Sequence, residues 1–148
     1  MKLICVCTGN TCRSPMMENI IRYYLRENSI TDIDVTSGGI MVDTNSVMSE
    51  NSQKALDELS IPYIVKNAHQ LTLNDILNAD LILCMTREHK MMLPPLDKII
   101  CVGEIKDCCD IADPYGQSEQ VYLTTAKYML NIADKIICFI KNITNATL

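Results

Sequence analysis

The chain has 148 residues, of which 48% are apolar and 21% charged, with a formal net charge of −5. We expect one domain over residues 1–148 with its own apolar core, and the composition excludes a disordered tail and a membrane protein. The acidic balance argues against nucleic acid or anionic lipid as a partner, although a local basic pocket can still bind an anion. Because no apolar run reaches the ~20 residues that span a bilayer, and residues 1–7 lead into a polar turn instead of a signal-peptide cleavage site, the expected location is cytoplasmic.

The eight cysteines raise the question of a disulfide framework. In a cytoplasmic protein these thiols are expected to be reduced. Cys5 and Cys84 lie in apolar runs and Cys138 lies on an amphipathic helix, so these three are expected to be buried core thiols. Cys108 and Cys109 lie in an acidic loop and receive no role. The spacing of cysteines and histidines fits no zinc-site pattern, so neither a metal nor an organic cofactor is expected.

Strand and helix patterns alternate along the chain. Residues 2–7 form an apolar run that predicts a buried strand ending in a tight loop. A helix follows, with Ser14 as its cap and Pro15 in its first turn. Its apolar stripe comprises Met17, Ile20, Ile21, Tyr24 and Leu25.

The later elements continue this alternation. In chain order they are a strand at residues 33–36 that closes at Gly38-Gly39, a helix over 50–59, a capping box at Thr72 and Asp75, a strand at 81–85, a helix over 86–93, a strand at 98–102 and a helix from about 118. This order predicts an α/β fold, a three-layer sandwich with a central four-stranded parallel sheet and helices on both faces. Ligands of such folds bind beyond the carboxyl ends of the strands, so the loop after the first strand is the expected site.

That loop carries a cysteine and an arginine separated by five residues. It reads Cys7, Thr8, Gly9, Asn10, Thr11, Cys12, Arg13 and Ser14. A loop that curls onto a helix N-terminus can point successive amides at one anion, and the helix dipole adds positive potential there. Gly9 and Asn10 suit such a turn because both tolerate positive φ. The sequence therefore predicts a phosphate-binding loop over residues 8–14.

The residue types in this loop favour nucleophilic chemistry at phosphorus. The positive field of the helix N-terminus favours the thiolate of Cys7, which is the nucleophilic form. Arg13 offers a planar fork that engages two phosphoryl oxygens at once, which a lysine cannot do. The Ser14 hydroxyl is expected to hydrogen-bond the Cys7 sulfur. The alternative is a strand-to-helix turn that holds a cysteine and an arginine by chance, and the accompanying Gly, Asn, Ser and Pro favour the phosphate site.

The run CTGNTCRSP resembles the phosphate-binding loop of the low-molecular-weight protein-tyrosine phosphatase family, and the likeness extends over nearly the whole chain. Residues 37–39 resemble the family's turn after the second strand, residues 79–85 its third strand, and residues 113–115 its late acid-bearing loop. The resemblance implies phosphorylated proteins as partners and a phosphocysteine intermediate on Cys7. It also implies that Arg13 binds the phosphoryl group.

The same resemblance assigns Asp113 as the acid that protonates the leaving group and then activates the hydrolytic water. Asp-Pro is also a common turn, which is the alternative for this position. Tyr115 is expected to line the cleft and stack against a flat group of the substrate. His69 is expected to be a solvated surface histidine.

Substrate preference is expected to depend on Thr11. Tyrosine-directed members of the family usually carry a bulkier aliphatic residue there, whereas its protein-arginine phosphatases carry threonine in a very similar CTGNTCRSPM string. A threonine leaves space and a hydroxyl beside the phosphorus, which suits a planar phosphoguanidinium. Phosphoarginine is therefore the favoured substrate. Tyr115 favours the alternative, a protein-tyrosine phosphatase, because Asp-Pro-Tyr is the commoner form in that group.

The sequence also bears on three further functions. Arsenate reduction relays electrons through two more cysteines, and although Cys84 lies near one relay position, residues 85–93 contain no second cysteine. A phosphate-binding module without catalysis is disfavoured because both Cys7 and Asp113 are present. Redox control is a hypothesis based on Cys7 and Cys12, which are close enough in sequence for a reversible disulfide that would protect Cys7. The alternative is that Cys12 only packs beneath the loop. The sequence indicates no oligomer interface.

Overall fold

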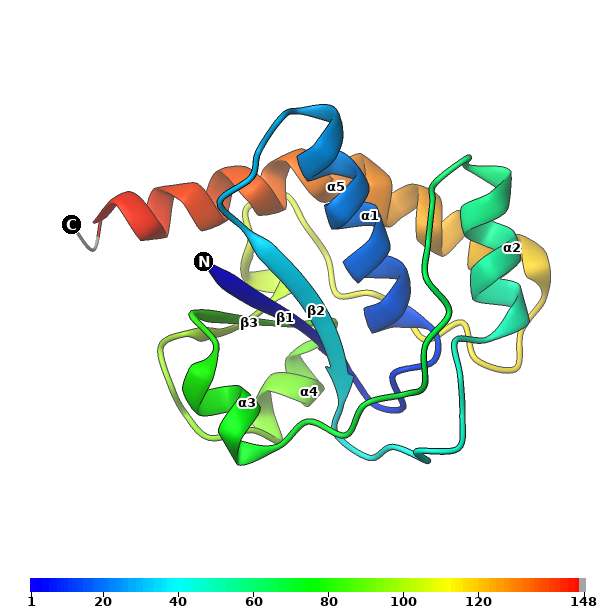
Figure 1. The fold of residues 1–148 in the computed structure, drawn as a ribbon, viewed down its shortest axis with the longest axis horizontal. Coiled ribbons are helices and arrows are strands. Elements are labelled where there is room, and N and C mark those ends of the chain that lie inside the picture. The colour runs from blue at the N-terminus through cyan, green and yellow to red at the C-terminus, as the bar shows by residue number, and fades with distance from the viewer. Residues whose placement is uncertain (147–148) are drawn as a thin grey trace.

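A computed structural model of the chain describes residues 1–146 and shows one sheet of four parallel strands in the order β2-β1-β3-β4 (Figure 1). The strands are β1 (Lys2–Cys7), β2 (Asp34–Gly39), β3 (Leu81–Cys84) and β4 (Ile99–Cys101). Val6 of β1 pairs with Gly38 on one side and with Cys84 on the other. Because the chain builds the sheet outward from β1 in both directions, the carboxyl end of β1 is the point where an open α/β sheet binds its ligand.

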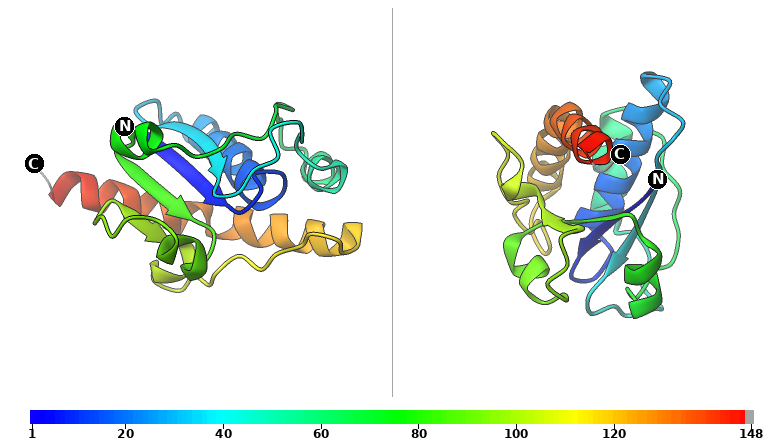
Figure 2. Two further views of the ribbon diagram at one scale, coloured as in Figure 1. Left: turned by 90° about the horizontal axis from the view of Figure 1, so that it is seen from below. Right: turned by 90° about the vertical axis from the view of Figure 1, so that its left-hand side faces the viewer.

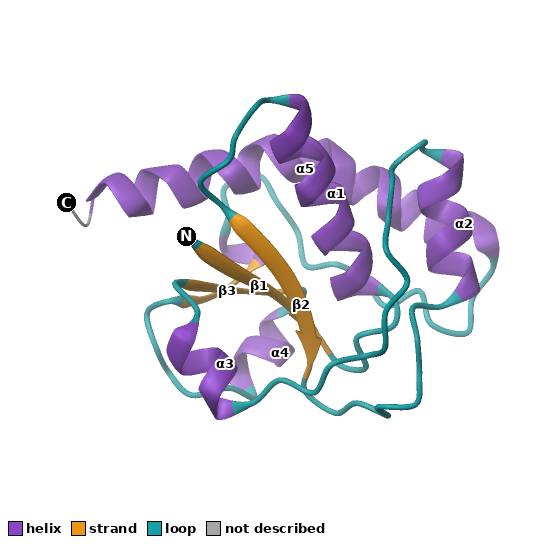
Figure 3. Cartoon of the chain, in the orientation of Figure 1, coloured by secondary structure: helices purple, strands orange, loops and turns teal. Residues whose placement is uncertain are grey.

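Helices lie on both faces of this sheet (Figures 2 and 3). On one face are α1 (Arg13–Glu27), α5 (Glu119–Ala146) and α2 (Glu50–Glu58), which packs against α5, and on the other are α3 (Leu73–Asn78) and α4 (Arg87–Met91). A 3-10 turn, Val102–Glu104, follows β4. The predicted three-layer α/β sandwich is confirmed.

The alternation of side chains along β1 feeds two apolar cores. Leu3, Cys5 and Cys7 face the larger core beneath α1 and α5, whereas Ile4 and Val6 face the smaller core beneath α3. Burial on both faces explains why β1 is apolar from Leu3 to Cys7. The predicted stripe of α1 is buried in the larger core, apart from Tyr24, which is half-buried.

Some element boundaries differ from the prediction. β2 continues through Gly38 and Gly39 instead of closing before them. A Cβ atom at Gly39 would lie 2.5 Å from Val42 Cγ2 and 2.6 Å from the Thr8 carbonyl oxygen, so only glycine allows the loop after β1 to pass this close. α4 ends two residues before the predicted position, and β4 is shorter because residue 102 joins the 3-10 turn. The capping box of Thr72 and Asp75 is confirmed.

Two predictions for single residues were wrong. Ser14 does not cap α1, because the helix begins at Arg13 with Cys12 as its N-cap residue and without a side-chain cap. Cys138 is exposed instead of buried, because the neighbouring positions Ile137 and Ile140 carry the core-facing side of α5. All eight cysteines are free thiols. No helix within residues 1–146 is both long and apolar enough to cross a bilayer.

Candidate active site

A cavity of about 250 Å³ opens at the carboxyl end of β1. It is lined by Cys7, Thr8, Gly9, Thr11, Cys12, Arg13, Asp113 and Tyr115. The fold thus brings the predicted phosphate-binding loop and the predicted acid-bearing loop, which are far apart in the sequence, to one cavity. Tyr115 lies at this site with 76% of its surface exposed.

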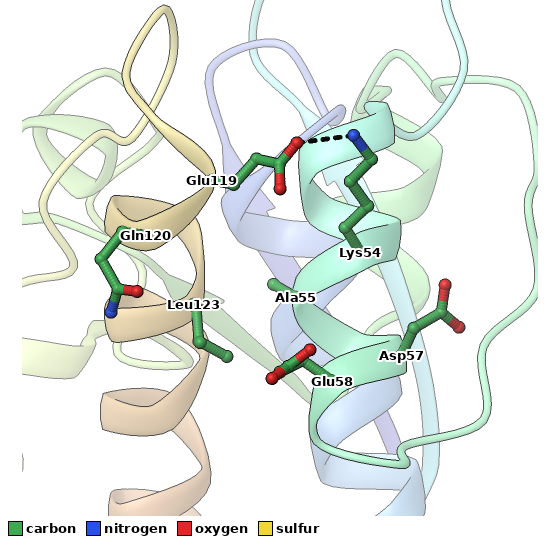
Figure 4. Close-up of a pocket in the computed structure, with 7 residues that line it drawn as sticks. All are labelled: Lys54, Ala55, Asp57, Glu58, Glu119, Gln120 and Leu123. Atoms are coloured by element: carbon green, nitrogen blue, oxygen red, sulfur yellow. Dashed lines mark hydrogen bonds and ion pairs between the residues drawn. The ribbon is translucent and has the colours of Figure 1, made fainter.

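A wider cavity of about 500 Å³ lies between α2 and α5 (Figure 4). An ion pair of 2.6 Å between Lys54 Nζ and Glu119 Oε1 links the two helices there, and Ala55 and Leu123 add apolar surface. None of its seven lining residues is a cysteine, histidine or arginine. It therefore offers no group for the chemistry considered above, and the smaller cavity is the candidate site.

The loop after β1 leaves its backbone donors unpaired. Within residues 1–146, no protein group accepts a hydrogen bond from the N–H groups of residues 8–12. The loop carbonyls are instead held from outside, since the N–H of Met41 donates to Thr8 O at 3.0 Å and the N–H of Ser49 donates to Thr11 O at 2.9 Å. Free amides beside the N-terminus of α1 form a site for an anion. Asn10 has the expected positive φ, 55°, whereas Gly9 does not.

The Cys7 sulfur ends a chain of buried hydrogen bonds. Ser14 Oγ lies 2.9 Å from Cys7 Sγ, as the sequence predicted. Asn10 Nδ2 donates to Ser14 Oγ at 2.8 Å and to Ser37 Oγ at 2.9 Å, so both hydroxyls act as acceptors there. The Ser37 hydroxyl in turn donates to the carboxylate of Glu18. Ser14 keeps its own proton, which it can donate to a Cys7 thiolate, with the more distant carbonyl of residue 38 as the competing acceptor at 3.3 Å.

Glu18 accepts the last hydrogen bond of the series that begins at the Cys7 sulfur. Its side chain is only 1% exposed, and its Oε1 atom accepts from Lys66 Nζ at 2.7 Å and lies 3.0 Å from Arg22 Nη2. Two cations thus compensate a buried carboxylate. Asn10 is fixed from a third side, because its Oδ1 accepts the backbone N–H of His69 at 2.8 Å. The sequence analysis missed Glu18, whose only local signal was the i,i+4 spacing to Arg22.

The His69 side chain is half-exposed and pairs with Asp75 at 2.8 Å, so it is a surface histidine as expected. Only its backbone serves the site.

Arg13 and Asp113 meet at the cavity. The Arg13 side chain is 8% exposed, its Nη1 donates to the Ile111 carbonyl at 3.1 Å, and its Nη2 lies 3.4 Å from Asp113 Oδ2. Asp113 is 56% exposed, and its other oxygen accepts the backbone N–H of Tyr115 at 3.1 Å. A buried cationic fork and a solvent-accessible carboxylate therefore face the same space, which suits phosphoryl binding together with proton transfer.

The sequence profile of the low molecular weight phosphotyrosine protein phosphatases matches residues 2–145. The chain belongs to this family. It is therefore a cysteine-dependent protein phosphatase that acts on phosphoproteins.

Two relatives of this phosphatase carry different substrate names at equal identity. It is 33% identical over 141 residues to a low molecular weight protein-tyrosine-phosphatase PtpB of Staphylococcus epidermidis, covering 92% of this chain and 96% of the relative. It is also 33% identical over 132 residues to a protein-arginine-phosphatase of Bacillus subtilis, covering 84% and 87%. A solved YwlE arginine phosphatase mutant with a phosphorylated active-site serine superposes with a TM-score of 0.87 at 28% identity, covering 95% of this chain and 96% of that one.

Cys12 lies beneath the loop of the phosphatase in the larger core. Its sulfur is 3.2 Å from the Tyr122 hydroxyl and 3.5 Å from the Ser49 hydroxyl. Burial, and then the contact with Cys12, raise the pKa of Tyr122 far above its ordinary value, so this hydroxyl keeps its proton and can donate it to the sulfur. Thr11 lines the cavity, and its hydroxyl lies 3.6 Å from the same sulfur.

Cys84 lies in the smaller core of the phosphatase beside Cys101, whereas Cys7 belongs to the larger core on the opposite face of the sheet. Burial raises the pKa of Cys84 to about 12, so its thiol is un-ionised at neutral pH. This placement disfavours a relay of electrons from Cys7. Within residues 1–146, no group of three or more His, Cys, Asp or Glu side chains is placed to hold a metal ion.

Proposed function

We propose that this phosphatase hydrolyses phosphoarginine on cytoplasmic proteins through a phosphocysteine intermediate. The observation that carries the proposal is the cavity lined by Cys7, Thr11 and Arg13, beside a loop in which the N–H groups of residues 8–12 have no acceptor within residues 1–146. This arrangement supplies a nucleophile and a set of donors for the equatorial oxygens of a phosphoryl group. We assign Thr8 to Ser14 as the phosphate-binding residues.

In the first step, the Cys7 thiolate attacks phosphorus. A sulfur–phosphorus bond forms, and the bond from phosphorus to the leaving nitrogen or oxygen breaks with its electron pair staying on the leaving atom. Asp113 gives its proton to that atom. The amides and Arg13 stabilise the charge that gathers on the phosphoryl oxygens.

In the second step, the Asp113 carboxylate takes a proton from water as the water oxygen attacks phosphorus. The sulfur–phosphorus bond breaks, inorganic phosphate leaves, and the Cys7 thiolate is restored. Ser14 donates a hydrogen bond to the sulfur as it departs. The phosphorylated active-site serine of the YwlE mutant supports a covalent route, because it places a phosphoryl group on a side chain of that protein's active site.

Thr11 favours phosphoarginine over phosphotyrosine. Its short side chain leaves room beside the phosphorus for a planar guanidinium. Tyr115 is compatible with either substrate, because an exposed aromatic face stacks on a guanidinium as well as on a phenyl ring. The protein-arginine-phosphatase of B. subtilis supports this choice, and the equally similar tyrosine-named relative keeps phosphotyrosine as the alternative.

The test is the ratio of kcat/KM for a phosphoarginine peptide over that for a matched phosphotyrosine peptide, with Cys7→Ser as the inactive control. We expect a ratio well above one. We also expect Thr11→Ile to lower the ratio at least ~10-fold by walling off the guanidinium, while the isosteric Thr11→Val lowers it less. A wild-type ratio well below one would reassign the enzyme to phosphotyrosine, and a ratio unchanged in Thr11→Ile would remove the reason given for Thr11.

A second proposal concerns regulation of the same site. Cys7 and Cys12 both belong to the larger core, and both line the cavity. We infer that an oxidised Cys7 sulfenic acid is attacked by the Cys12 sulfur, which forms a disulfide and releases water. Thiol reductants would then restore the enzyme, so oxidation would be reversible.

A further inference from the structure

His89 faces the phosphate-binding loop from α4, on the opposite side of the sheet from α1. It is 5% exposed and does not line the cavity itself. Its Nε2 atom lies 2.9 Å from Thr8 Oγ1 and 3.5 Å from Arg13 Nη2. A buried imidazole therefore contacts two residues of the loop without touching the space that the substrate would occupy.

The start of α4 fixes which ring nitrogen carries the proton. Two groups of Thr86 approach His89 Nδ1: the backbone N–H at 3.2 Å, which can only donate, and the hydroxyl oxygen Oγ1 at 2.9 Å. Nδ1 is therefore an acceptor without a proton, and the neutral ring carries its proton on Nε2. The N–H of His89 donates back to Thr86 Oγ1 at 3.3 Å, which completes a reciprocal capping box.

This tautomer sets the direction of the contacts at Nε2. The Nε2–H group donates to Thr8 Oγ1, because the Arg13 guanidinium has no acceptor to offer. The 3.5 Å approach of Arg13 Nη2 joins two donors and is not a hydrogen bond. Thr8 Oγ1 is then an acceptor toward His89, so its own proton remains available to a group in the cavity that Thr8 lines.

We propose that His89 is a positioning residue of this phosphatase, which holds the Thr8 hydroxyl as a donor to the phosphoryl group. This inference rests on the proposed binding of the phosphoryl group by the loop and Arg13. The position requires a neutral ring. A second proton would sit on Nδ1, where the Thr86 N–H could no longer donate, and the charged ring would repel Arg13.

The surroundings of the ring favour that neutral state. Burial and the nearby guanidinium of Arg13 lower the pKa of His89, while the carboxylates of Glu88, Asp113 and Asp110 act in the opposite direction without reversing the shift.

Two substitutions separate the functions of the ring nitrogens. His89→Gln keeps an amide N–H at the distance of Nε2, where it reaches Thr8, whereas His89→Asn keeps an acceptor at the distance of Nδ1 for the Thr86 N–H but is too short to reach Thr8. The readouts are kcat/KM for p-nitrophenyl phosphate and the Kd of orthovanadate, which report on the loop whatever protein substrate the enzyme prefers. We expect His89→Asn to lose about 5- to 10-fold in both, as a lost buried hydrogen bond predicts, and His89→Gln to stay within about 2-fold of wild type.

Thr8, which accepts the hydrogen bond from His89, supplies a matched pair of variants. Thr8→Val removes only the hydroxyl and should lower both quantities, whereas Thr8→Ser keeps the hydroxyl and should retain them. Adding His89→Asn to Thr8→Val should cause no further loss, because both changes break the same hydrogen bond. Independent losses that multiply, or a His89→Asn enzyme with wild-type values, would overturn the proposal.

If the His89 variants fail to fold, the Thr8 pair decides alone, since equal vanadate affinity in Thr8→Val and Thr8→Ser would contradict the proposal. A wild-type enzyme with no activity on either p-nitrophenyl phosphate or the phosphoarginine peptide would refute the proposed function itself. An active wild type with unchanged variants would refute only the positioning by His89.

Discussion

The Cys7 Sγ and Ser14 Oγ atoms lie 2.9 Å apart, and the same hydroxyl oxygen accepts from Asn10 Nδ2 at 2.8 Å. Because Asn10 occupies the acceptor side of the hydroxyl, the Ser14 proton is left for the sulfur. The thiolate is therefore steadied by a donor whose own orientation is set from the opposite side, through Ser37 and the buried carboxylate of Glu18.

Ser14→Ala should lower kcat about 10- to 100-fold, because a hydrogen bond to a charged group contributes ~1.5–3 kcal/mol. The loss should fall mainly on the second step, in which sulfur leaves, so a burst of leaving group should appear in rapid-mixing experiments. Ser37→Ala is the matched control. It removes a hydroxyl that lies further from the sulfur in the series of hydrogen bonds, so it should lower kcat less. Wild-type kcat in Ser14→Ala would contradict the contribution assigned to this contact.

Asp113→Asn should lower kcat about 10²- to 10⁴-fold, the range typical of a lost general acid–base group. The rate of the burst should fall less for p-nitrophenyl phosphate than for the phosphate ester of a phenol of high pKa, because p-nitrophenolate departs without much protonation. Asp110→Asn provides a comparison, since Asp110 accepts from the backbone of Arg87 and Gly103 and does not line the cavity. Equal losses in the two variants would argue against a proton transfer by Asp113.

His89 couples stability to pH. Its pKa lies below the ordinary value of ~6.5 because burial and Arg13 disfavour the charged ring. The unfolded chain therefore takes up this proton at a higher pH than the folded chain. The stabilisation is present above about pH 6.5 and is lost as the pH falls through the lowered pKa.

Urea unfolding measures this effect directly. The free energy of unfolding should fall more steeply between about pH 7 and pH 5 in the wild type than in His89→Gln. The same slope in both proteins would show that His89 does not titrate as described.

Cys12→Ser should remain active but fail to recover fully when a thiol reductant follows peroxide, because Cys7 would then be oxidised beyond the sulfenic acid. Cys138→Ser is a suitable control, since Cys138 is exposed and lies outside the cavity. Full recovery of Cys12→Ser would show that Cys12 only packs beneath the loop against Tyr122.

Local patterns predicted the fold and the central part of the site well. The apolar run of β1, the Cys-x5-Arg loop and the start of α1 are contiguous, so their strand–loop–helix arrangement follows from neighbouring residues alone. Ser14 shows the limit of such reasoning. A serine before a proline is a typical cap signal, but here the helix N-terminus stays uncapped by a side chain and its amides stay available for an anion.

The residues that support the site were not predictable in this way. Glu18 depends on Lys66 from a distant segment, and His89 reaches Thr8 across 81 positions of sequence. Neither pairing leaves a local pattern, because each exists only after β1, β2 and β3 are side by side. The prediction for Cys138 was wrong for a different reason. Cys138 lies at the border of the apolar stripe of α5, where a shift of one position along the helix turns a side chain from the core to solvent.

The most direct test of the account is the site to which the phosphoryl group is transferred. Ser14→Ala enzyme, in which the departure of the sulfur is slowed, is mixed with a labelled phosphoarginine peptide, denatured within the first turnover and digested, and the labelled residue is identified by mass spectrometry. The account predicts one phosphoryl group on the sulfur of Cys7, and none on that peptide in Cys7→Ala. Turnover by the wild type with the label on another residue, or with no labelled Cys7 at any time point, would contradict it.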